Sequence, residues 1–457
     1  MKDEKTVRKG SGFNSKIGFI LAAAGSAVGL GNIWRFPYLA AKYGGGFFLL
    51  IYIIFTLTFG FALMLTETAI GRKTGKSVIG AYKAMDKRFA PLGWLAAFVP
   101  AIILPYYCVI GGWVFKYLTV FVMGAGSEAA GDGSFFGSFI GNASQSTLFF
   151  VIYIALTAVV VMLGVEKGIE KVSKFMMPVL VVLTIGIAIY TMTLDGAGEG
   201  VKYYLLPNFD GFTISKLLKT IAAAVGQLFY SMSLAMGIMI TYGSYMRKDD
   251  SLESSVRYIE IFDTIIAFLA GLIIVPSVFV FSGGDADKLQ AGPSLMFITL
   301  PSVFESMAGG QIIGAVFFLL VALAALTSSI SLMETVVSIV CEKFKIKRIP
   351  CCLIVIVFCL AVGMLSVLGY SVWDTVTIFG YQFLDFFDFI SNNIMMPIVA
   401  FMTCILISYV VGTKYVEDEV TLGQKRFKSQ ALFRVMVKYV CPVCMIIILI
   451  TPFVTNI

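Results

Sequence analysis

The chain has 457 residues, of which 59% are hydrophobic and only 13% charged, with a formal net charge of +7. Soluble domains carry charge on about a quarter of their residues. The composition, with a mean hydropathy of +0.92, therefore excludes an ordinary soluble protein and indicates an all-α integral membrane protein. The chain contains no histidine, which excludes histidine-ligated metal sites, Ser-His-Asp triads and histidine proton relays, and we expect no enzyme.

Apolar runs predict about eleven transmembrane helices, at about 20 residues per span. The expected spans are 17–42, 47–71, 91–122, 147–164, 171–194, 218–245, 258–282, 311–341, 349–369, 383–410 and 433–455. Strongly basic segments precede the first span and follow the second, fourth, sixth and eighth, whereas 123–146 contains no basic residue. This alternation predicts a cytoplasmic N-terminus and an external C-terminus in the cell (plasma) inner membrane. The segment after the fifth span, with Lys202 and Lys216, fits least well.

The first span contains the polar stretch Gly25 to Arg35, read as GSAVGLGNIWR. Backbone that leaves the helix at membrane depth is tolerated only where it is buried in protein or lines a cavity. We therefore expect a helix interrupted near 27–31, whose free carbonyls hold a cation and whose free amides hold an anion. The alternative is a glycine-rich packing face between helices, but Asn32 and Arg35 favour a functional break.

The sixth span has a similar stretch, 225–237, with Gln227, Ser231 and Ser233 at membrane depth. One interruption in each half of a chain is typical of transporters with a binding site at the membrane midplane. The seventh span carries Asp263, whose burial in a span favours a functional or paired carboxylate.

Four hydroxyls occur in the eighth span, in the run 324–331, where hydrogen bonding within and between helices is by itself the more ordinary role. The tenth span begins with Phe383-Leu-Asp-Phe-Phe-Asp388. Asp388 lies at an outward depth similar to that of Arg35, and we expect the two to pair.

These residues together resemble the neurotransmitter/sodium symporter family, which has the LeuT fold, and in particular its shorter bacterial amino-acid transporters. The motifs are Val28-Gly-Leu-Gly-Asn-Ile-Trp-Arg-Phe-Pro37, Gly45-Gly46, Gly226-Gln-Leu-Phe-Tyr230, Thr241-Tyr-Gly-Ser-Tyr245 and Leu326-Thr-Ser-Ser329. The resemblance implies one transmembrane domain, 1–457, built from two inverted five-helix repeats at about 12–194 and 215–410. The first and sixth helices would be broken, and one further helix would follow at about 433–455.

The resemblance also implies binding residues. A first sodium ion would contact Ala27, Asn32, Ser231 and Asp263, and a second would contact Gly25, Val28, Ala324, Thr327 and Ser328. The substrate would be bound by Ala27, Leu30, Gly31, Ile103, Tyr107, Tyr230, Ser233, Met236, Ser328 and Leu332. The gates would be Arg35 with Asp388 outside and Tyr245 with Glu342 inside. The arginine that the family uses in its inner gate aligns with Gly10, so that Arg8 or Lys9 would replace it.

Two differences from other members of the family determine the expected substrate and the expected dependence on chloride. Monoamine transporters have an aspartate where this chain has Gly29, so the substrate should bring its own carboxylate. Chloride-dependent members have asparagine and serine where this chain has Asp263 and Ala267, so a fixed carboxylate should replace chloride. The resemblance thus implies chloride-independent import of a neutral hydrophobic amino acid with sodium, expected as two ions, by alternating access.

The partners implied are the amino acid, sodium ions and the lipid bilayer, with no nucleic acid and no required oligomer. A sodium-coupled carrier of another small solute on the same fold is one alternative. A channel or a receptor-like membrane protein is another, although a channel needs a continuous polar pore. The polar residues of this chain instead converge on one midplane position.

Overall fold

The computed structural model describes residues 12–454 of the chain, apart from 132, 208, 210–212, 283–291 and 423–425. This described part is helical, and its only extended pairs are the isolated bridges Gly45–Pro207 and Ile378–Tyr381. Nine of its continuous helices are long and apolar enough to cross a membrane, and a bent pair at the start of the chain makes a tenth. The chain is thus a multi-pass all-α membrane protein, as its composition predicts.

The helices in the first half are α1 (Lys16–Ala27), η1 (Gly31–Arg35), α2 (Phe36–Lys42), α3 (Gly46–Phe55), η2 (Thr56–Gly60), α4 (Phe61–Thr74), α5 (Val78–Met85), η3 (Lys87–Phe89), α6 (Ala90–Val122), α7 (Gly126–Ala129), α8 (Ser134–Gly141), α9 (Ala143–Met162), η4 (Val165–Glu170), α10 (Lys171–Met192) and α11 (Ala197–Leu205). Those in the second half are α12 (Ile214–Ser231), α13 (Ile238–Ser244), α14 (Leu252–Ser282), η6 (Leu295–Thr299), α15 (Leu300–Glu305), α16 (Gly310–Phe344), α17 (Arg348–Gly369), α18 (Phe383–Asp388), η7 (Phe389–Met395), α19 (Met396–Ile405), η8 (Leu406–Val410), α20 (Lys414–Leu422), α21 (Gln430–Val435), η9 (Met436–Val440) and α22 (Cys441–Val454).

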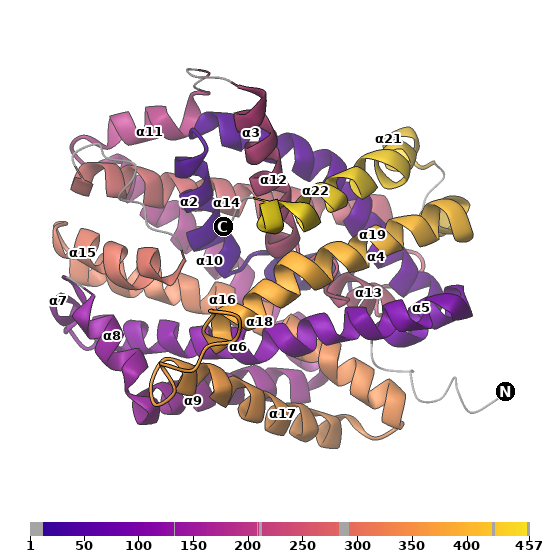
Figure 1. The fold of residues 1–457 in the computed structure, drawn as a ribbon, viewed down its shortest axis with the longest axis horizontal. Coiled ribbons are helices and arrows are strands. Elements are labelled where there is room, and N and C mark those ends of the chain that lie inside the picture. Colours follow the sequence, from indigo (N-terminus) through magenta and orange to yellow (C-terminus); the bar gives the residue numbers. More distant parts are fainter. Residues whose placement is uncertain are drawn as a thin grey trace.

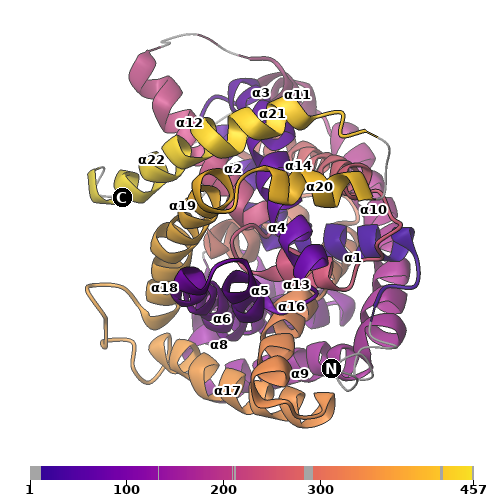
Figure 2. The same ribbon diagram turned by 90° about the vertical axis from the view of Figure 1, so that its right-hand side faces the viewer.

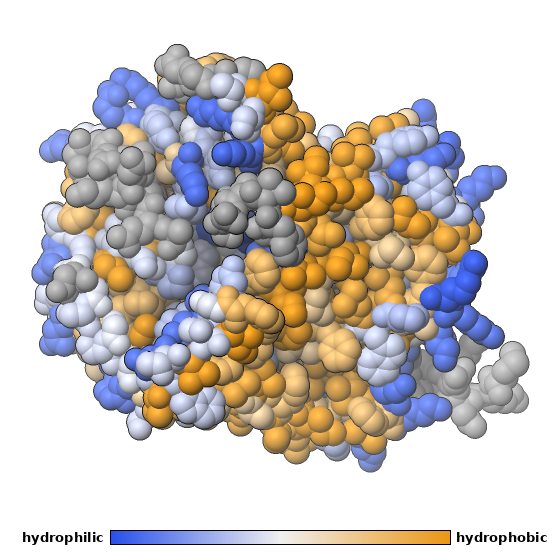
Figure 3. Space-filling view, viewed as in Figure 1, coloured by the Kyte–Doolittle hydropathy of each residue, from blue (hydrophilic) through white to orange (hydrophobic). Residues whose placement is uncertain are grey.

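Helices α6 and α17 and the continuous helical run from α18 to η8 lie along the long axis of the molecule, with α7, α8 and α15 at one end and α5 and α21 at the other (Figure 1). Apolar side chains form a broad band across the middle of the visible face, and polar side chains gather toward both ends (Figure 3). This distribution fits a hydrocarbon layer around the middle of the bundle.

The first expected span is broken, as the sequence predicts. Helix α1 ends at Ala27, Val28 and Gly29 are not helical, and the two parts of the span meet at a bend of 54°. The cause is local, because glycines and polar side chains weaken the helix at this depth.

The sixth expected span is broken as well, into α12 and α13, with 232–237 outside either helix. Ser233, Ala235 and Gly237 in this segment have φ of 53°, 59° and 71°, which is left-handed backbone that only glycine adopts without strain. Surrounding contacts must therefore hold the segment in place.

Glycines let α13 pack directly against the backbone of α4. A Cβ added at Gly71 would come within 1.9 Å of the Ile240 carbonyl oxygen, and one at Gly243 within 2.3 Å of that of Thr68. Such close backbone approach is typical of membrane helices with small residues at the contact. It places the second break firmly beside α4.

Candidate functional site

A cavity lies between the two helix breaks and the helices α6 and α16. It is lined by Ser26, Ala27, Gly29, Leu30, Gly31, Ile103, Tyr107, Tyr230, Ser233, Met236, Ile238, Ser328 and Leu332. The ten residues that the sequence analysis assigns to the substrate are all in this lining, and Ser26, Gly29 and Ile238 are additions. Their role in binding stays a prediction, but the chain brings them to one place from four separate segments.

The first break turns a backbone amide toward this cavity. The Leu30 N–H donates to the Tyr107 hydroxyl over 3.5 Å, and η1 begins at the next residue, Gly31. The first N–H groups of a helix lack carbonyl partners within it, and they favour an anion. A substrate carboxylate therefore has suitable donors at this end of the cavity.

Beside the break lies the fully buried carboxylate of Asp263, on α14. Its oxygens accept hydrogen bonds from Asn32 Nδ2 at 2.7 Å, Ser231 Oγ at 2.9 Å and the Tyr52 hydroxyl at 3.4 Å. Asn32 Nδ2 also donates to Ser231 Oγ at 3.0 Å. All three donors are neutral, and a buried carboxylate among neutral partners is costly unless a cation compensates it. The three side chains expected at the first sodium ion are thus in contact, and their chemistry fits one.

One hydroxyl of α16 contacts a carbonyl of the first break, and a second bonds to a carbonyl of α16 itself. Ser328 Oγ donates toward the Val28 carbonyl at 3.3 Å, and Thr327 Oγ1 donates to that of Ala324 at 3.0 Å. A Cβ added at Gly25 would lie 3.2 Å from the Thr327 Cβ. The residues expected at the second sodium ion are therefore neighbours, and neutral oxygens are suitable ligands for a hard cation.

The two glycines of the break leave space that side chains of other helices fill. A Cβ at Gly29 would come within 2.6 Å of Ser328 Oγ and 3.2 Å of the Tyr107 hydroxyl, and one at Gly31 within 2.3 Å of the Tyr230 ring. The structure thus leaves no room for an aspartate at Gly29 without moving Ser328.

On the outer side, Arg35 and Asp388 do not form the direct ion pair that the sequence led us to expect. The Asp388 Oδ1 atom accepts hydrogen bonds from the Tyr106 hydroxyl at 3.0 Å and from Asn392 Nδ2 at 2.6 Å. The Arg35 guanidinium instead lies 5.7 Å from the centroid of the Tyr230 ring. Among the described residues, Tyr106 and Asn392 thus bond the Asp388 carboxylate in place of Arg35, and the role of Arg35 and Asp388 as an outer gate stays a prediction.

On the inner side, Tyr245 contacts Glu334, and the gate role expected of Glu342 stays a prediction. The Tyr245 hydroxyl donates to Glu334 Oε1 at 2.8 Å, and Arg348 forms an ion pair with the same carboxylate. Glu342 accepts the Ser77 backbone N–H at 2.5 Å. Arg8 and Lys9, the expected substitutes for the arginine of the family's inner gate, lie outside the described residues.

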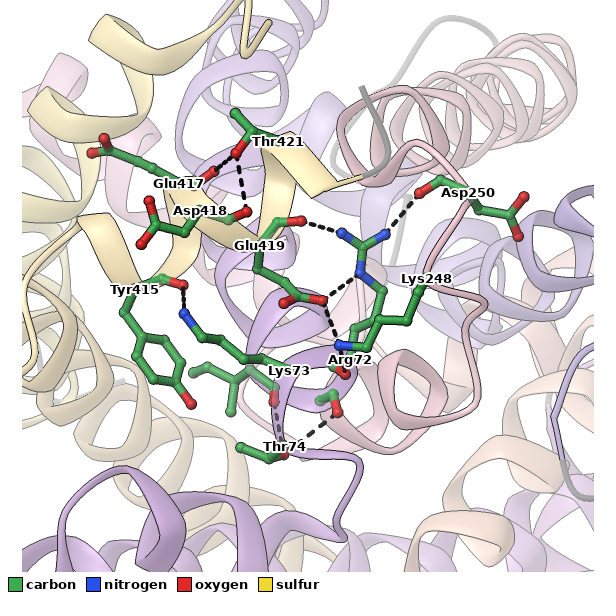
Figure 4. A network of polar contacts seen from close by, with 12 residues as sticks. Arg72, Lys73, Thr74, Lys248, Asp250, Tyr415, Glu417, Asp418, Glu419 and Thr421 are labelled. Atoms are coloured by element: carbon green, nitrogen blue, oxygen red, sulfur yellow. Dashed lines mark hydrogen bonds and ion pairs between the residues drawn. The ribbon is translucent and has the colours of Figure 1, made fainter. Parts of the chain in front are cut away.

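A second polar network lies at the end of the molecule that faces the viewer in Figure 2, where α20 covers the end of α4 (Figures 2 and 4). Arg72, which is buried, pairs with Glu419 of α20 at 2.8 Å and donates to the Asp250 carbonyl at 2.7 Å. Lys248 also pairs with Glu419, at 2.9 Å. This network joins α20 to α4 and to the connection before α14.

A further pair fastens α20 to the last span. Arg434 of α21 donates to both oxygens of Glu417, at 2.7 and 2.6 Å. These hydrogen bonds, together with one from Gln430, hold the pKa of Glu417 at about 2, although burial opposes the shift. Two of the three acidic residues of α20, Glu417 and Glu419, thus fix this segment between the last two spans.

Sequence reasoning assigned no role to several residues of these clusters. Tyr52, Tyr106 and Asn392 contact predicted site residues, while Glu334 and Arg348 complete the inner cluster. A buried acidic residue in a span, as at Glu334, is a signal that could have been used. The tyrosines gave no such signal, because they are common in apolar spans.

Comparison with known proteins places this geometry in a family. The model of the Sodium:neurotransmitter symporter family matches residues 10–124 and 137–456. The chain is 36% identical to the uncharacterized sodium-dependent transporter YhdH of Bacillus subtilis, over 98% of both chains. It is 31% identical to an uncharacterized sodium-dependent transporter of Haemophilus influenzae, over 96% of this chain and 97% of that protein.

A solved structure is similar in both sequence and fold. The crystal structure of MhsT in complex with L-phenylalanine superposes with a TM-score of 0.86 at 33% sequence identity, covering 96% of this chain and 99% of the MhsT chain.

Proposed function

Because the chain belongs to the Sodium:neurotransmitter symporter family, we propose that it imports a neutral hydrophobic amino acid together with sodium, by alternating access and without chloride. Proteins of this family are sodium-coupled membrane transporters, so the chain is a transporter and not an enzyme. The proposal concerns the identity of the substrate, the number of ions and the independence from chloride.

The observation that carries the proposal is an apolar cavity that has the Leu30 amide at one end and a buried carboxylate, that of Asp263, beside the same helix break. Ile103, Met236 and Leu332 give the cavity an apolar lining, which rejects a charged side chain because of its desolvation cost. The Leu30 amide, near the Tyr107 hydroxyl, suits the carboxylate of an amino acid. The solved relative holds L-phenylalanine, which has both an apolar side chain and a carboxylate.

Two sodium ions are proposed as co-substrates. Asn32, Ser231 and Asp263, with the Ala27 carbonyl, would hold the first ion. Thr327 and Ser328, with the carbonyls of Gly25, Val28 and Ala324, would hold the second. Each ion would offset charge that is otherwise costly at membrane depth: the Asp263 carboxylate and the freed carbonyl dipoles.

The same carboxylate supports independence from chloride. Asp263 supplies a fixed negative charge beside Asn32, while Ala267, one turn further along α14, is buried and offers no hydroxyl for an anion. We also propose a cytoplasmic N-terminus, an external C-terminus and two inverted repeats, at about 12–194 and 215–410, followed by one appended helix.

The test is uptake of labelled leucine into proteoliposomes of the purified protein. We expect uptake to require sodium, to persist when gluconate replaces chloride, and to be inhibited by methionine, isoleucine and valine. Inhibition by lysine or glutamate but not by methionine would contradict the assignment of the pocket. Replacing Asp263 and Ala267 by Asn and Ser should introduce a chloride requirement, and a wild-type protein that already stops without chloride would refute the charge argument.

A further inference from the structure

We infer that the hydroxyls of Ser26 and Ser233, in a cluster with that of Ser331, form a specificity-determining surface that accepts a hydrogen bond from the substrate side chain. This inference rests on the proposed function and deepens it. Ser26 lies at the end of α1, Ser233 in the second break and Ser331 on α16. Ser26 Oγ lies 3.1 Å from Ser233 Oγ and 2.6 Å from Ser331 Oγ. Ser26 and Ser233 line the cavity, and all three are buried.

The hydrogen atoms of this cluster are all used within it. Three hydroxyls carry three hydrogens, yet they make four contacts that each need one. Two are the hydroxyl–hydroxyl contacts of Ser26. The others are from Ser233 Oγ to the Ser26 carbonyl at 2.9 Å and from Ser331 Oγ to the Ser328 carbonyl at 2.8 Å. No hydrogen remains to be donated into the cavity, whereas lone pairs on Ser26 and Ser233 do remain.

The neighbouring Ser328 adds no donor. Its single hydrogen is shared between the carbonyls of Ser26 and Val28, at 3.2 and 3.3 Å. A substrate acceptor could therefore be bound only by breaking an internal hydrogen bond. The serine surface thus presents acceptors alone toward the substrate side chain.

The rest of the cavity lining determines which substrate side chains the serines stabilise. Ile103, Met236 and Leu332 offer no polar group, and the Tyr107 hydroxyl lies at the other end of the cavity, beside the Leu30 N–H. A polar atom of a substrate side chain that lies among these three apolar residues must therefore be satisfied by the serines. An indole N–H is a donor without an acceptor and is satisfied completely. Amides and sulfoxides bring an acceptor that would be buried without a partner, which is costly. The surface should therefore admit indole side chains beside apolar ones and reject side chains that carry acceptors.

The test compares pairs of ligands that differ in one polar group, as competitors of labelled leucine in sodium. L-Tryptophan is compared with 3-benzothienyl-L-alanine, in which sulfur replaces the indole N–H. We expect tryptophan to bind about 3- to 10-fold more tightly, the range of one hydrogen bond. L-Methionine sulfoxide should bind at least about tenfold more weakly than L-methionine, because its oxygen meets only acceptors.

In the Ser26→Ala variant, the ratio of the affinities for tryptophan and its benzothienyl analogue should fall toward one. Ser233 and Ser331 keep their carbonyl partners in this variant, so the fold should be retained. Because both affinities are measured on the same variant, their ratio cancels general effects on binding. Ser329→Ala is the matched control. Its hydroxyl bonds to Thr157 Oγ1 at 2.9 Å and it is absent from the cavity lining, so the ratio should remain at the wild-type value.

The inference would be overturned if the wild-type protein bound tryptophan and its analogue equally, or if the difference in affinity persisted in Ser26→Ala. Equal binding of methionine and its sulfoxide would overturn it as well. These outcomes are separate from failure of the proposed function. If sodium supports leucine binding while the ratio is one, only the acceptor surface is wrong. If sodium does not support leucine binding at all, the proposed function is wrong and the inference falls with it.

Discussion

Asn32 donates one amide hydrogen to Asp263 Oδ1 at 2.7 Å and the other to Ser231 Oγ at 3.0 Å. This single side chain joins the first helix break to α12 and to α14. Asn32 and Asp263 are 231 positions apart in the sequence, so their contact depends on the packed bundle and not on local structure. It gives a buried carboxylate a defined position beside the backbone that the break releases.

Replacing Asp263 by Asn should lower the apparent affinity for sodium by at least about tenfold. The substitution keeps the shape but removes the charge that compensates a bound cation, and a hydrogen bond to a charged group is worth about 1.5–3 kcal/mol. A sodium titration of leucine binding measures the effect. The exposed Asp195 provides the control, since Asp195→Asn should leave the titration unchanged. An unaltered sodium midpoint in Asp263→Asn would refute a sodium site at this carboxylate.

Adding one methyl group at Gly31 should strongly weaken binding of leucine. The new Cβ would lie 2.3 Å from the Tyr230 ring, whereas a Cβ at Gly186 of α10 would meet nothing within 4 Å. Tyr230 would have to shift into the cavity that it lines, and overpacking of this kind costs about 1–3 kcal/mol. Competition binding should show a loss of about tenfold in Gly31→Ala and none in Gly186→Ala. Equal affinities of the two variants for leucine would show that Tyr230 does not form a wall of the binding site.

The network of Figure 4 should be important for stability. Glu419→Gln leaves the buried Arg72 guanidinium without its carboxylate, and breaking a buried pair in this way costs about 3–5 kcal/mol. Thermal unfolding in detergent should show a clearly lower midpoint. The comparison is Glu199→Gln, which breaks the exposed pair with Lys202 and should cost about 0–1 kcal/mol. Similar midpoints for the two variants would argue against a structural role of α20.

The Glu417–Arg434 pair predicts a stability that falls in acid. Hydrogen bonds from Arg434 lower the pKa of Glu417 from 4.5 to about 2. A lowered pKa in the folded state stabilises the fold above the unfolded value, and this contribution is lost as pH falls from about 4.5 toward 2. Unfolding midpoints measured across that window should decline less steeply in Glu417→Gln than in the wild type. Parallel declines would show that the pair contributes nothing to the acid sensitivity.

The sequence predicted those features that local chemistry determines. Gly29, Gly31 and Asn32 within one apolar run predicted the first break, and the polar residues of 225–237 predicted the second. Resemblance to the family then supplied the residues that the structure places around one cavity, although Ile103, Tyr107, Met236 and Leu332 lie outside the quoted motifs.

What the sequence could not show is which distant groups satisfy one another. Asp388 is bonded by Tyr106 across 282 residues, and Arg72 by Glu419 across 347. Charged residues at the ends of spans look like interfacial anchors in a sequence, so neither pairing has a local signal. The hydrogen accounting of Ser26, Ser233 and Ser331 likewise needs distances between three separate elements.

The most direct test of sodium coupling is whether a sodium gradient alone drives leucine against its own gradient. Proteoliposomes with equal leucine on both sides are given an inward sodium gradient, and internal labelled leucine is followed before and after gramicidin collapses that gradient. We predict accumulation above the external concentration, followed by loss of the excess when gramicidin is added. Leucine that only equilibrates, or accumulation that continues unchanged after gramicidin, would contradict sodium-coupled symport.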